Sequence, residues 1–426
     1  MWLRSTALAV FAAASCLPAW AQPPETLTLD DAFARVAQSH PDLRLIDGQR
    51  NVLSAEAERA SLRPAWVAGL QIENALGTGD ASGFQQAEIS LTLASVLERG
   101  GKLDARRTLA QTRIDSLALQ RETKRLDLLA EVARRYLAIS AAQDQRRIAD
   151  LDVAQRTRTV AGARQRLVAG ASPESVVLTA QAALARAELE RDRAQQRSAA
   201  ARQHLAALWG ERNPAFEVVA GDPLVLPDIA DFAALDALLT STPELARFAD
   251  EQRIGEARLQ LARSQATPDL DWQVGVRRLQ ATDDFALIGS VSMPLGSSRR
   301  AQPDLRIAEA ELALVEIERE AQGLSLYSTL SEAHGRYRVA QFEVSRLQSD
   351  VLPKLTKAEA AAERAYRGGA ISYLEWAQLQ SERTNARKQQ LEAALEAQRA
   401  LIEIQRLTGQ AFVASRSSPT TQGTKP

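Results

Sequence analysis

The side chains best suited to hold a metal ion or to act as a nucleophile are few in this chain. Of its 426 residues, three are histidines and one is a cysteine. The histidines, His40, His204 and His334, lie far apart and in none of the spacings by which zinc sites recruit their ligands. The sequence also lacks a nucleophile elbow, a P-loop, an HExxH motif and a dinucleotide-binding fingerprint. We therefore expect no catalytic residue, no metal site and no cofactor.

The single cysteine, Cys16, lies in an N-terminal segment that has the features of an export signal. Arg4 supplies a positive start, an apolar stretch follows, and Ala-Trp-Ala at 19–21 forms a small-x-small cleavage site. Cleavage there would remove residues 1–21 as a signal peptide and leave no cysteine for disulfides or thiolate metal sites. In the alternative, Ala-Ala-Ser-Cys at 13–16 acts as a lipobox, and Cys16 is lipidated.

Composition argues against several other classes of protein. A net charge of −1 provides no basic surplus for binding nucleic acid. Beyond the N-terminal segment there is no run of about 18 apolar residues, so a transmembrane helix is not expected and any membrane crossing would use β-strands. Aromatic residues make up only 5% of the chain. Ala, Leu, Arg, Glu and Gln dominate instead, which is typical of long helices packed on other helices.

The sequence repeats itself at an offset of about two hundred residues, the signature of an internal duplication. SHPDLR at 39–44 returns as STPELAR at 241–247, and Gly-Ala-Ser at 170–172 returns as Gly-Ala-Ile-Ser at 369–372. The expected organisation is a signal peptide at 1–21, a first repeat at 22–210, a proline-containing linker at 211–240, a second repeat at 241–410 and a disordered tail at 411–426.

Each repeat is expected to contain a helix, two strands, a long helix, a tight turn and a long returning helix. The strands alternate between apolar and polar residues. The apolar positions are Trp66, Ala68, Leu70, Ile72; Ala87, Ile89, Leu91, Leu93; Leu270, Trp272, Val274, Val276; and Phe285, Leu287, Gly289, Val291, Met293. Strands of about nine to eleven residues can cross a bilayer with the apolar face toward lipid. The alternative is an ordinary soluble sheet whose apolar face covers a core.

The helices are expected to be long and to pack by coiled-coil contacts. From Leu103 to Leu167 the chain has no proline and, apart from Gly162, no glycine. Pro353 should kink or restart the long helix of the second repeat. Four strands cannot close a barrel, and open strand edges in lipid would leave backbone groups unpaired. The chain is therefore expected to oligomerise.

Two helix-turn-helix segments, at 166–190 and 365–392, together with the duplication, make the whole mature chain similar to the TolC family of outer-membrane efflux factors. Glu73-Asn74 with Gly77, the ERGGK motif at 98–102 and the stretch at 283–295 resemble the branch that serves cobalt–zinc–cadmium and other heavy-metal efflux pumps. Family members often differ from this chain at the strand-to-helix junctions. Export of organic drugs or type I protein secretion therefore stays an alternative, and a periplasmic coiled-coil scaffold is a third.

The resemblance implies a mainly α-helical fold with a small membrane β part. Three protomers would form a homotrimer, with a twelve-stranded β-barrel in the outer membrane joined to an α-helical barrel in the periplasm. Such a duct would serve a tripartite pump, in which the helical tips meet a periplasmic membrane-fusion adaptor linked to an inner-membrane transporter of the resistance-nodulation-division (RND) type. Heavy-metal cations are the expected cargo, conducted rather than coordinated.

The resemblance also implies roles for particular residues. The adaptor-docking tips are expected at Gly170, Ala171, Ser172, Gly369, Ala370 and Ile371, where glycine also suits a tight turn. Glu375 occupies the place of an acidic residue of the periplasmic constriction, where threefold repetition would form a ring of carboxylates; alternatively it is an ordinary solvated glutamate. Trp66 and Trp272 are expected in an interfacial aromatic belt, the alternative being burial in a core.

Overall fold

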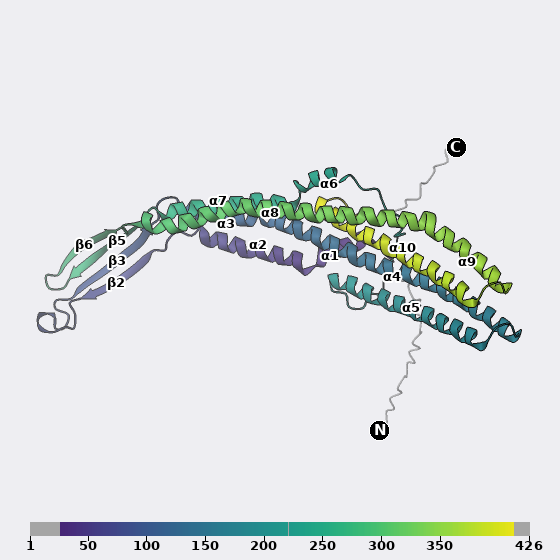
Figure 1. The fold of residues 1–426 in the computed structure, drawn as a ribbon. Coiled ribbons are helices and arrows are strands. Elements are labelled where there is room, and N and C mark those ends of the chain that lie inside the picture. Colours follow the sequence, from purple (N-terminus) through teal and green to yellow (C-terminus); the bar gives the residue numbers. More distant parts are fainter. Residues whose placement is uncertain (1–25, 220, 413–426) are drawn as a thin grey trace, which may run out of the picture.

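The computed structural model describes residues 26–219 and 221–412 as a long, curved rod (Figure 1). A small β-sheet forms one end, and two helical hairpins end together at the other (Figure 1). The expected signal peptide, Cys16 and nearly all of the expected tail lie outside the described residues.

The elements follow one order twice along the chain. The first half contains β1 (Thr26–Leu27), α1 (Leu29–Ser39), α2 (Pro41–Ala60), β2 (Val67–Glu73), a 3₁₀ turn (Gly79–Ala81), β3 (Glu88–Leu97), α3 (Lys102–Asp115), α4 (Leu117–Val168), α5 (Glu174–Ala206) and a 3₁₀ turn (Ala207–Trp209). The rest contains β4 (Glu217–Val218), α6 (Phe232–Leu239), α7 (Pro243–Gln265), β5 (Leu270–Leu279), β6 (Asp284–Ser292), α8 (Ser297–Arg346), a π-helical turn (Leu347–Val351), α9 (Leu352–Arg367) and α10 (Tyr373–Thr408). The expected fold class, long helices with four strands that form one sheet, is confirmed; the repeat boundaries stay predictions.

The four longer strands form one antiparallel sheet in the order β2-β3-β5-β6. The central pair, β3 and β5, comes from different halves of the chain and pairs from Glu88↔Leu279 to Leu97↔Leu270. Among the described residues, β2 and β6 are paired on one side only, so both edges of the sheet present free backbone groups. The sheet is thus an open segment that joins the two halves.

The long helices carry two local interruptions. The helix expected from 103 onward is not continuous, because Ser116 separates α3 from α4; its hydroxyl donates to the Arg113 carbonyl (2.8 Å), a back-bond of the kind that bends helices. In the second half, the π-helical turn precedes a restart at Leu352, which confirms the expected disturbance at Pro353. No helix of the described segments is both long enough and apolar enough to span a membrane.

Buried tyrosines in the middle of the rod fasten the segment that connects the two halves. The Tyr136 hydroxyl on α4 bonds the carbonyls of Leu27 (3.1 Å) and Val219 (2.8 Å), and the Tyr337 hydroxyl on α8 donates to the carbonyl of Pro227. Burial raises the pKa of each tyrosine to about 12. This connection, expected as a proline-containing linker, also contains α6 and the strand β4, which pairs in parallel with β1.

Candidate functional site

The sheet exposes a continuous row of apolar side chains on one face. Leu70, Leu91, Val276 and Leu287 are direct cross-strand neighbours on β2, β3, β5 and β6. Their exposed fractions are 68%, 63%, 43% and 89%. Among the described residues no core covers this face, which argues against the ordinary soluble sheet and indicates a surface that contacts another apolar medium.

The opposite face of the sheet is polar and carries an ion-pair cluster. Arg277 on β5 lies 2.6 Å from Glu88 on β3 and 3.3 Å from Glu73 on β2, and it donates to the Ser90 hydroxyl (3.0 Å). The three charged groups come from three neighbouring strands. This arrangement suits an aqueous face, since charged groups in lipid would be costly.

The two tryptophans expected at equivalent strand starts are brought into contact. Trp66, just before β2, and Trp272 on β5 lie edge to face with ring centroids 5.3 Å apart. Trp66 is 65% exposed, so burial in a core does not explain it. Their place at a membrane interface stays a prediction.

The ERGGK motif at 98–102 connects the sheet to the helices. Glu98 accepts two hydrogen bonds from the Arg106 guanidinium (2.5 and 2.8 Å), which lower the pKa of the Glu98 carboxyl. Lys102, buried, lies 2.7 Å from Asp269, which belongs to the corresponding junction of the second half.

The two glycines of this motif have backbone conformations that favour glycine. Gly100 and Gly101 both have φ of +74°. A Cβ at Gly100 would lie 2.6 Å from the Cβ of Thr267, in the α7–β5 connection. The motif therefore joins the strand-to-helix junctions of the two halves, and its residues have structural partners that account for them.

The expected docking residues lie on two neighbouring hairpin turns at the far end of the rod (Figure 1). Gly170 and Gly369 have φ of +70° and +77°, and each turn is closed by a backbone bond, from Ala171 to Arg166 (2.8 Å) and from Ala370 to Ala365 (2.9 Å). Two apolar side chains that sequence reasoning missed are exposed beside these turns. They are Val168, 89% exposed, and Leu374, 72% exposed.

Glu375 lies at the start of α10, where it forms a capping box with Ser372. The Ser372 backbone N–H donates to the Glu375 carboxylate (2.8 Å), and the Glu375 N–H donates to the Ser372 hydroxyl (3.3 Å). The backbone bond is the main cause of the lowered pKa of Glu375. The carboxylate is exposed and therefore has a local structural role in addition to any part in a constriction, which stays a prediction.

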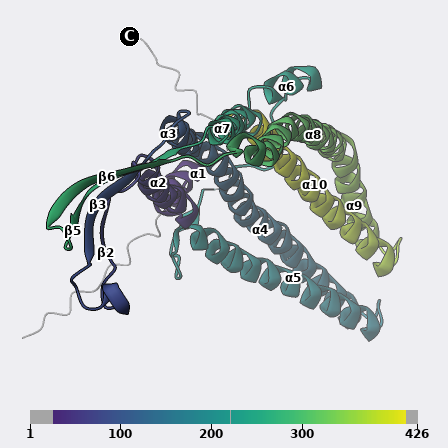
Figure 2. The same cartoon turned by 90° about the vertical axis from the view of Figure 1, so that its left-hand side faces the viewer.

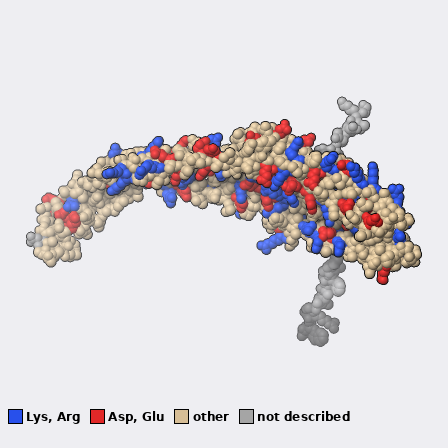
Figure 3. Space-filling view, in the orientation of Figure 1, with Lys and Arg blue, Asp and Glu red and all other residues tan. Residues whose placement is uncertain are grey.

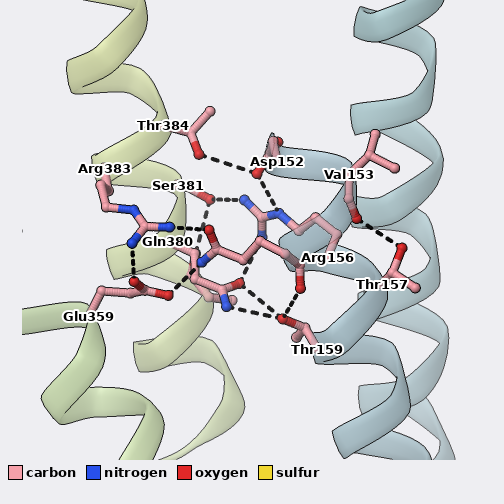
Figure 4. A network of polar contacts seen from close by, with 12 residues as sticks. Asp152, Val153, Arg156, Thr157, Thr159, Glu359, Gln380, Ser381, Arg383 and Thr384 are labelled. Carbon is pink, nitrogen blue, oxygen red and sulfur yellow. Dashed lines mark hydrogen bonds and ion pairs between the residues drawn. The ribbon is translucent and has the colours of Figure 1, made fainter. Parts of the chain in front are cut away.

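A buried polar network links α4 to α9 and α10 near the tips (Figure 4). Glu359 on α9 accepts from Gln155 on α4 (2.5 Å) and pairs with Arg383 on α10. The next residue of α4, Arg156, donates to Ser381 on α10 (3.0 Å). Sequence reasoning missed this network, because polar residues at helical spacing usually indicate a solvated face.

Within the described parts of the chain, no group of three or more His, Cys, Asp or Glu side chains could hold a metal ion. On the face seen in Figure 3, charged side chains gather over the helices, while the sheet end is mostly uncharged.

Comparison with known proteins identifies a matching family and a curated relative. A family model described as outer membrane efflux protein matches residues 34–211. The cobalt-zinc-cadmium resistance protein CzcC of Cupriavidus metallidurans is 29% identical over 280 residues, which cover 66% of this chain and 67% of that protein.

Solved structures share the fold over almost the whole chain. A structure of CusC, described with conformational changes that accompany folding and transmembrane channel formation, has a TM-score of 0.74 at 17% identity and covers 90% of this chain and 92% of CusC. The outer-membrane protein VceC of Vibrio cholerae has a TM-score of 0.70 at 16% identity, covering 90% of this chain and 97% of VceC. Residues 34–211 thus match the outer membrane efflux protein family, and the chain as a whole shares the fold of solved outer-membrane channel proteins.

Proposed function

We propose that the protein is the exit duct of a tripartite RND-type efflux pump, that it works as a homotrimer, and that its cargo is heavy-metal cations. The observation that carries this proposal is the exposed apolar row Leu70-Leu91-Val276-Leu287, backed by the polar face around Arg277. A sheet that is apolar on one side and charged on the other suits a wall between lipid and a water-filled lumen. As a channel of this family, the protein is not an enzyme.

The free edges of the sheet support the trimer. In lipid, the unpaired backbone groups of β2 and β6 would have no water to bond, so each edge needs a partner strand. The four-stranded sheet of one protomer is too narrow to close on itself, since the smallest membrane barrels have about eight strands. Three copies can pair edge to edge into one twelve-stranded barrel, with β6 of one protomer against β2 of the next. Every edge strand then has a partner for its backbone hydrogen bonds.

The tips support contact with a periplasmic membrane-fusion adaptor, which in turn would connect the duct to an inner-membrane RND transporter. Val168 and Leu374 place exposed apolar surface beside Gly170 and Gly369, at the end of the rod opposite the sheet. Exposed apolar side chains beside rigid turns suit the docking of a partner protein.

The similarity to CzcC, a protein named for cobalt, zinc and cadmium resistance, supports metal cations as cargo. The ERGGK motif adds little to this assignment, because its residues have structural partners at the sheet–helix junction. A duct need not select tightly when the transporter and the adaptor choose the cargo first.

Loss of the protein tests the cargo directly. A deletion strain should become sensitive to zinc, cobalt, cadmium, copper or silver salts and recover with a plasmid copy, while sensitivity to detergents and hydrophobic antibiotics barely changes. Normal metal tolerance with marked drug hypersensitivity would contradict the metal assignment and indicate organic efflux. Minimum inhibitory concentrations for both groups of compounds, measured in the same strains, separate the two outcomes.

A further inference from the structure

A cleft of about 730 Å³ lies between α4 and the α9–α10 pair, close to the tips. Figure 2 shows the two hairpins, α4–α5 and α9–α10, extending to the same end of the molecule. Both contribute walls, with Gln155 and Arg166 on one side and Tyr366 and Trp376 on the other. The volume falls within the range of small-molecule sites.

Unpaired hydrogen-bonding groups concentrate in the walls of this cleft. Six buried side-chain polar atoms of the described residues have no hydrogen-bond partner, and four belong to residues of the cleft: Arg166 Nε, Tyr366 Oη, Trp376 Nε1 and Arg383 Nε. The three nitrogens can only donate, and the tyrosine hydroxyl can donate as well. Tyr366 and Trp376 are only 4% and 5% exposed. Buried donors without acceptors cost free energy, which an acceptor-bearing ligand would offset.

Three of these residues form a stack that fixes their side chains. The Arg166 guanidinium carbon lies 4.8 Å from the centre of the Tyr366 ring, and that ring stacks on Trp376 at 4.9 Å with an interplanar angle of 25°. Arg166 also donates to the Tyr366 carbonyl, across the two hairpins. The donors therefore belong to a wall that is already ordered.

The charge of the walls favours an anion. Four arginines face two glutamates among the lining residues, a surplus of two positive charges. The glutamates are already paired, Glu359 with Arg383 and Glu363 with Arg367. Arg166 bonds only to backbone carbonyls, and the exposed Arg158 makes no ion pair with a described residue. Two guanidinium groups thus lack a carboxylate partner.

We propose that this cleft is a binding site for a small oxyanion, such as phosphate or a carboxylate. The ligand's oxygens would accept from the arginines and from the Tyr366 and Trp376 donors as the walls close on it. Because α4 and the α9–α10 pair both line the cleft, a bound anion would bridge the two hairpins and stabilise their packing. This inference holds whatever the channel exports.

The experiment uses the full chain, purified in detergent, with inorganic phosphate as the probe at constant ionic strength. Phosphate should raise the unfolding temperature in a saturable manner, and sodium chloride should not. Arg158→Gln removes an exposed, unpaired arginine and should weaken phosphate binding about tenfold without lowering the unfolding temperature of the phosphate-free protein. Tyr366→Phe and Trp376→Phe, which remove one donor each and keep most of the ring, should weaken binding about threefold to tenfold.

Arg164→Gln is the matched control, since Arg164 is an exposed arginine of α4 that does not line the cleft. It should bind phosphate as the wild type does. A phosphate effect that is absent from the wild type, or equal in Arg158→Gln, Trp376→Phe and Arg164→Gln, would overturn the proposal. Repeating the titration with citrate tests the carboxylate class, which should show the same order of variants.

Discussion

The two ends of the rod have opposite arrangements of polar and apolar side chains. At the sheet end, large apolar side chains such as Leu91 and Leu287 are exposed, while charged groups meet on the opposite face around Arg277. At the tip end, the charged pair Glu359–Arg383 lies buried between helices. One end thus depends on an apolar medium outside the chain, and the other on polar partners within it.

This difference predicts which kind of substitution should destabilise each end. The sheet end has no apolar core of its own, so what matters there is the face on which a new charge appears. The tip end is held by specific partners, so the loss of one partner matters more than polarity in general.

The largest effect per protomer is expected from Arg383→Met. The substitution leaves Glu359, whose side chain is 8% exposed, without its charged partner and also removes a bond to Gln155. Breaking a buried pair in this way costs about 3–5 kcal/mol. Thermal unfolding of the detergent-solubilised protein, followed by helical circular dichroism, should shift to lower temperature.

Two control variants identify the cause. The double variant Glu359→Met with Arg383→Met removes both charges and should recover much of the loss, because an apolar pair of similar volume can replace a buried ion pair. Arg336→Met breaks an exposed pair with Glu396 and should change stability by about 0–1 kcal/mol. Equal losses in all three variants would show that the network has no special role.

The next largest effect is expected from Leu91→Arg on the apolar row. A charge on the lipid face costs about 2–4 kcal/mol at mid-bilayer, and a trimer would repeat that cost in each protomer. The amount of trimer in the outer-membrane fraction should fall sharply, as should that of a Val274→Arg variant.

Gln273→Lys is the matched control for the sheet, because Gln273 pairs with Ala94 and Ser290 on the polar face. It should assemble nearly as well as the wild type. Glu88→Lys, on the same face, is a poorer control, since it also breaks the ion pair with Arg277. Equal tolerance of Leu91→Arg and Gln273→Lys would mean that the faces are wrongly assigned.

The contrast between the two ends also explains what could be predicted from the sequence. The sheet was predictable because period-2 alternation determines its faces, and the pairing of Leu91 with Val276 follows that pattern. The burial of Gln155 and Arg156 was not predictable, because polar residues at the same helical spacing also occur on solvated helix faces. Their burial depends on α9 and α10, about two hundred residues further along the chain.

Other features were also not predictable, because no local sequence pattern marks them. The two-residue strand β1 exists only through its pairing with β4, and no local pattern marks so short a strand. The helix break at Ser116 is a single turn residue between α3 and α4, and no glycine or proline near it marks the break in the sequence. The ERGGK motif at 98–102 resembled a marker of cargo, yet the Lys102–Asp269 pair gives it a structural partner in the other half.

A smaller effect is expected from Gly369→Val at the tip. The φ of +77° is unfavourable for a β-branched residue, with a cost of about 1–2 kcal/mol, while no backbone atom crowds the site. The protein should therefore fold as a trimer but bind its adaptor more weakly in a pull-down. Gly323→Val, within α8 and far along the chain from both turns, is the control and should keep full adaptor binding. Unchanged pull-down by Gly369→Val would count against a docking role.

The smallest structural effect is expected from Glu375→Gln, which separates the capping role of this residue from a role in ion passage. A capping box accepts glutamine in place of glutamate, so the bond with Ser372 can persist while the charge is lost. The lowered pKa of Glu375 means that its ionised form stabilises the start of α10 above the ordinary value of 4.5, and that this stabilisation is lost as the pH falls through the folded-state pKa. The variant should therefore lack this loss on acidification while its abundance at neutral pH stays unchanged.

Ion selectivity gives the second measurement on the same variant. If three Glu375 carboxylates form a ring, Glu375→Gln should lower the cation selectivity of the trimer in planar bilayers, because the ring's negative field is removed. Glu174→Gln is the matched control, since Glu174 is the exposed first residue of α5 at the other hairpin. It should leave selectivity unchanged. Equal selectivity in Glu375→Gln and the wild type would leave Glu375 with its capping role alone. Any cation filter of the duct would then lie away from the tips.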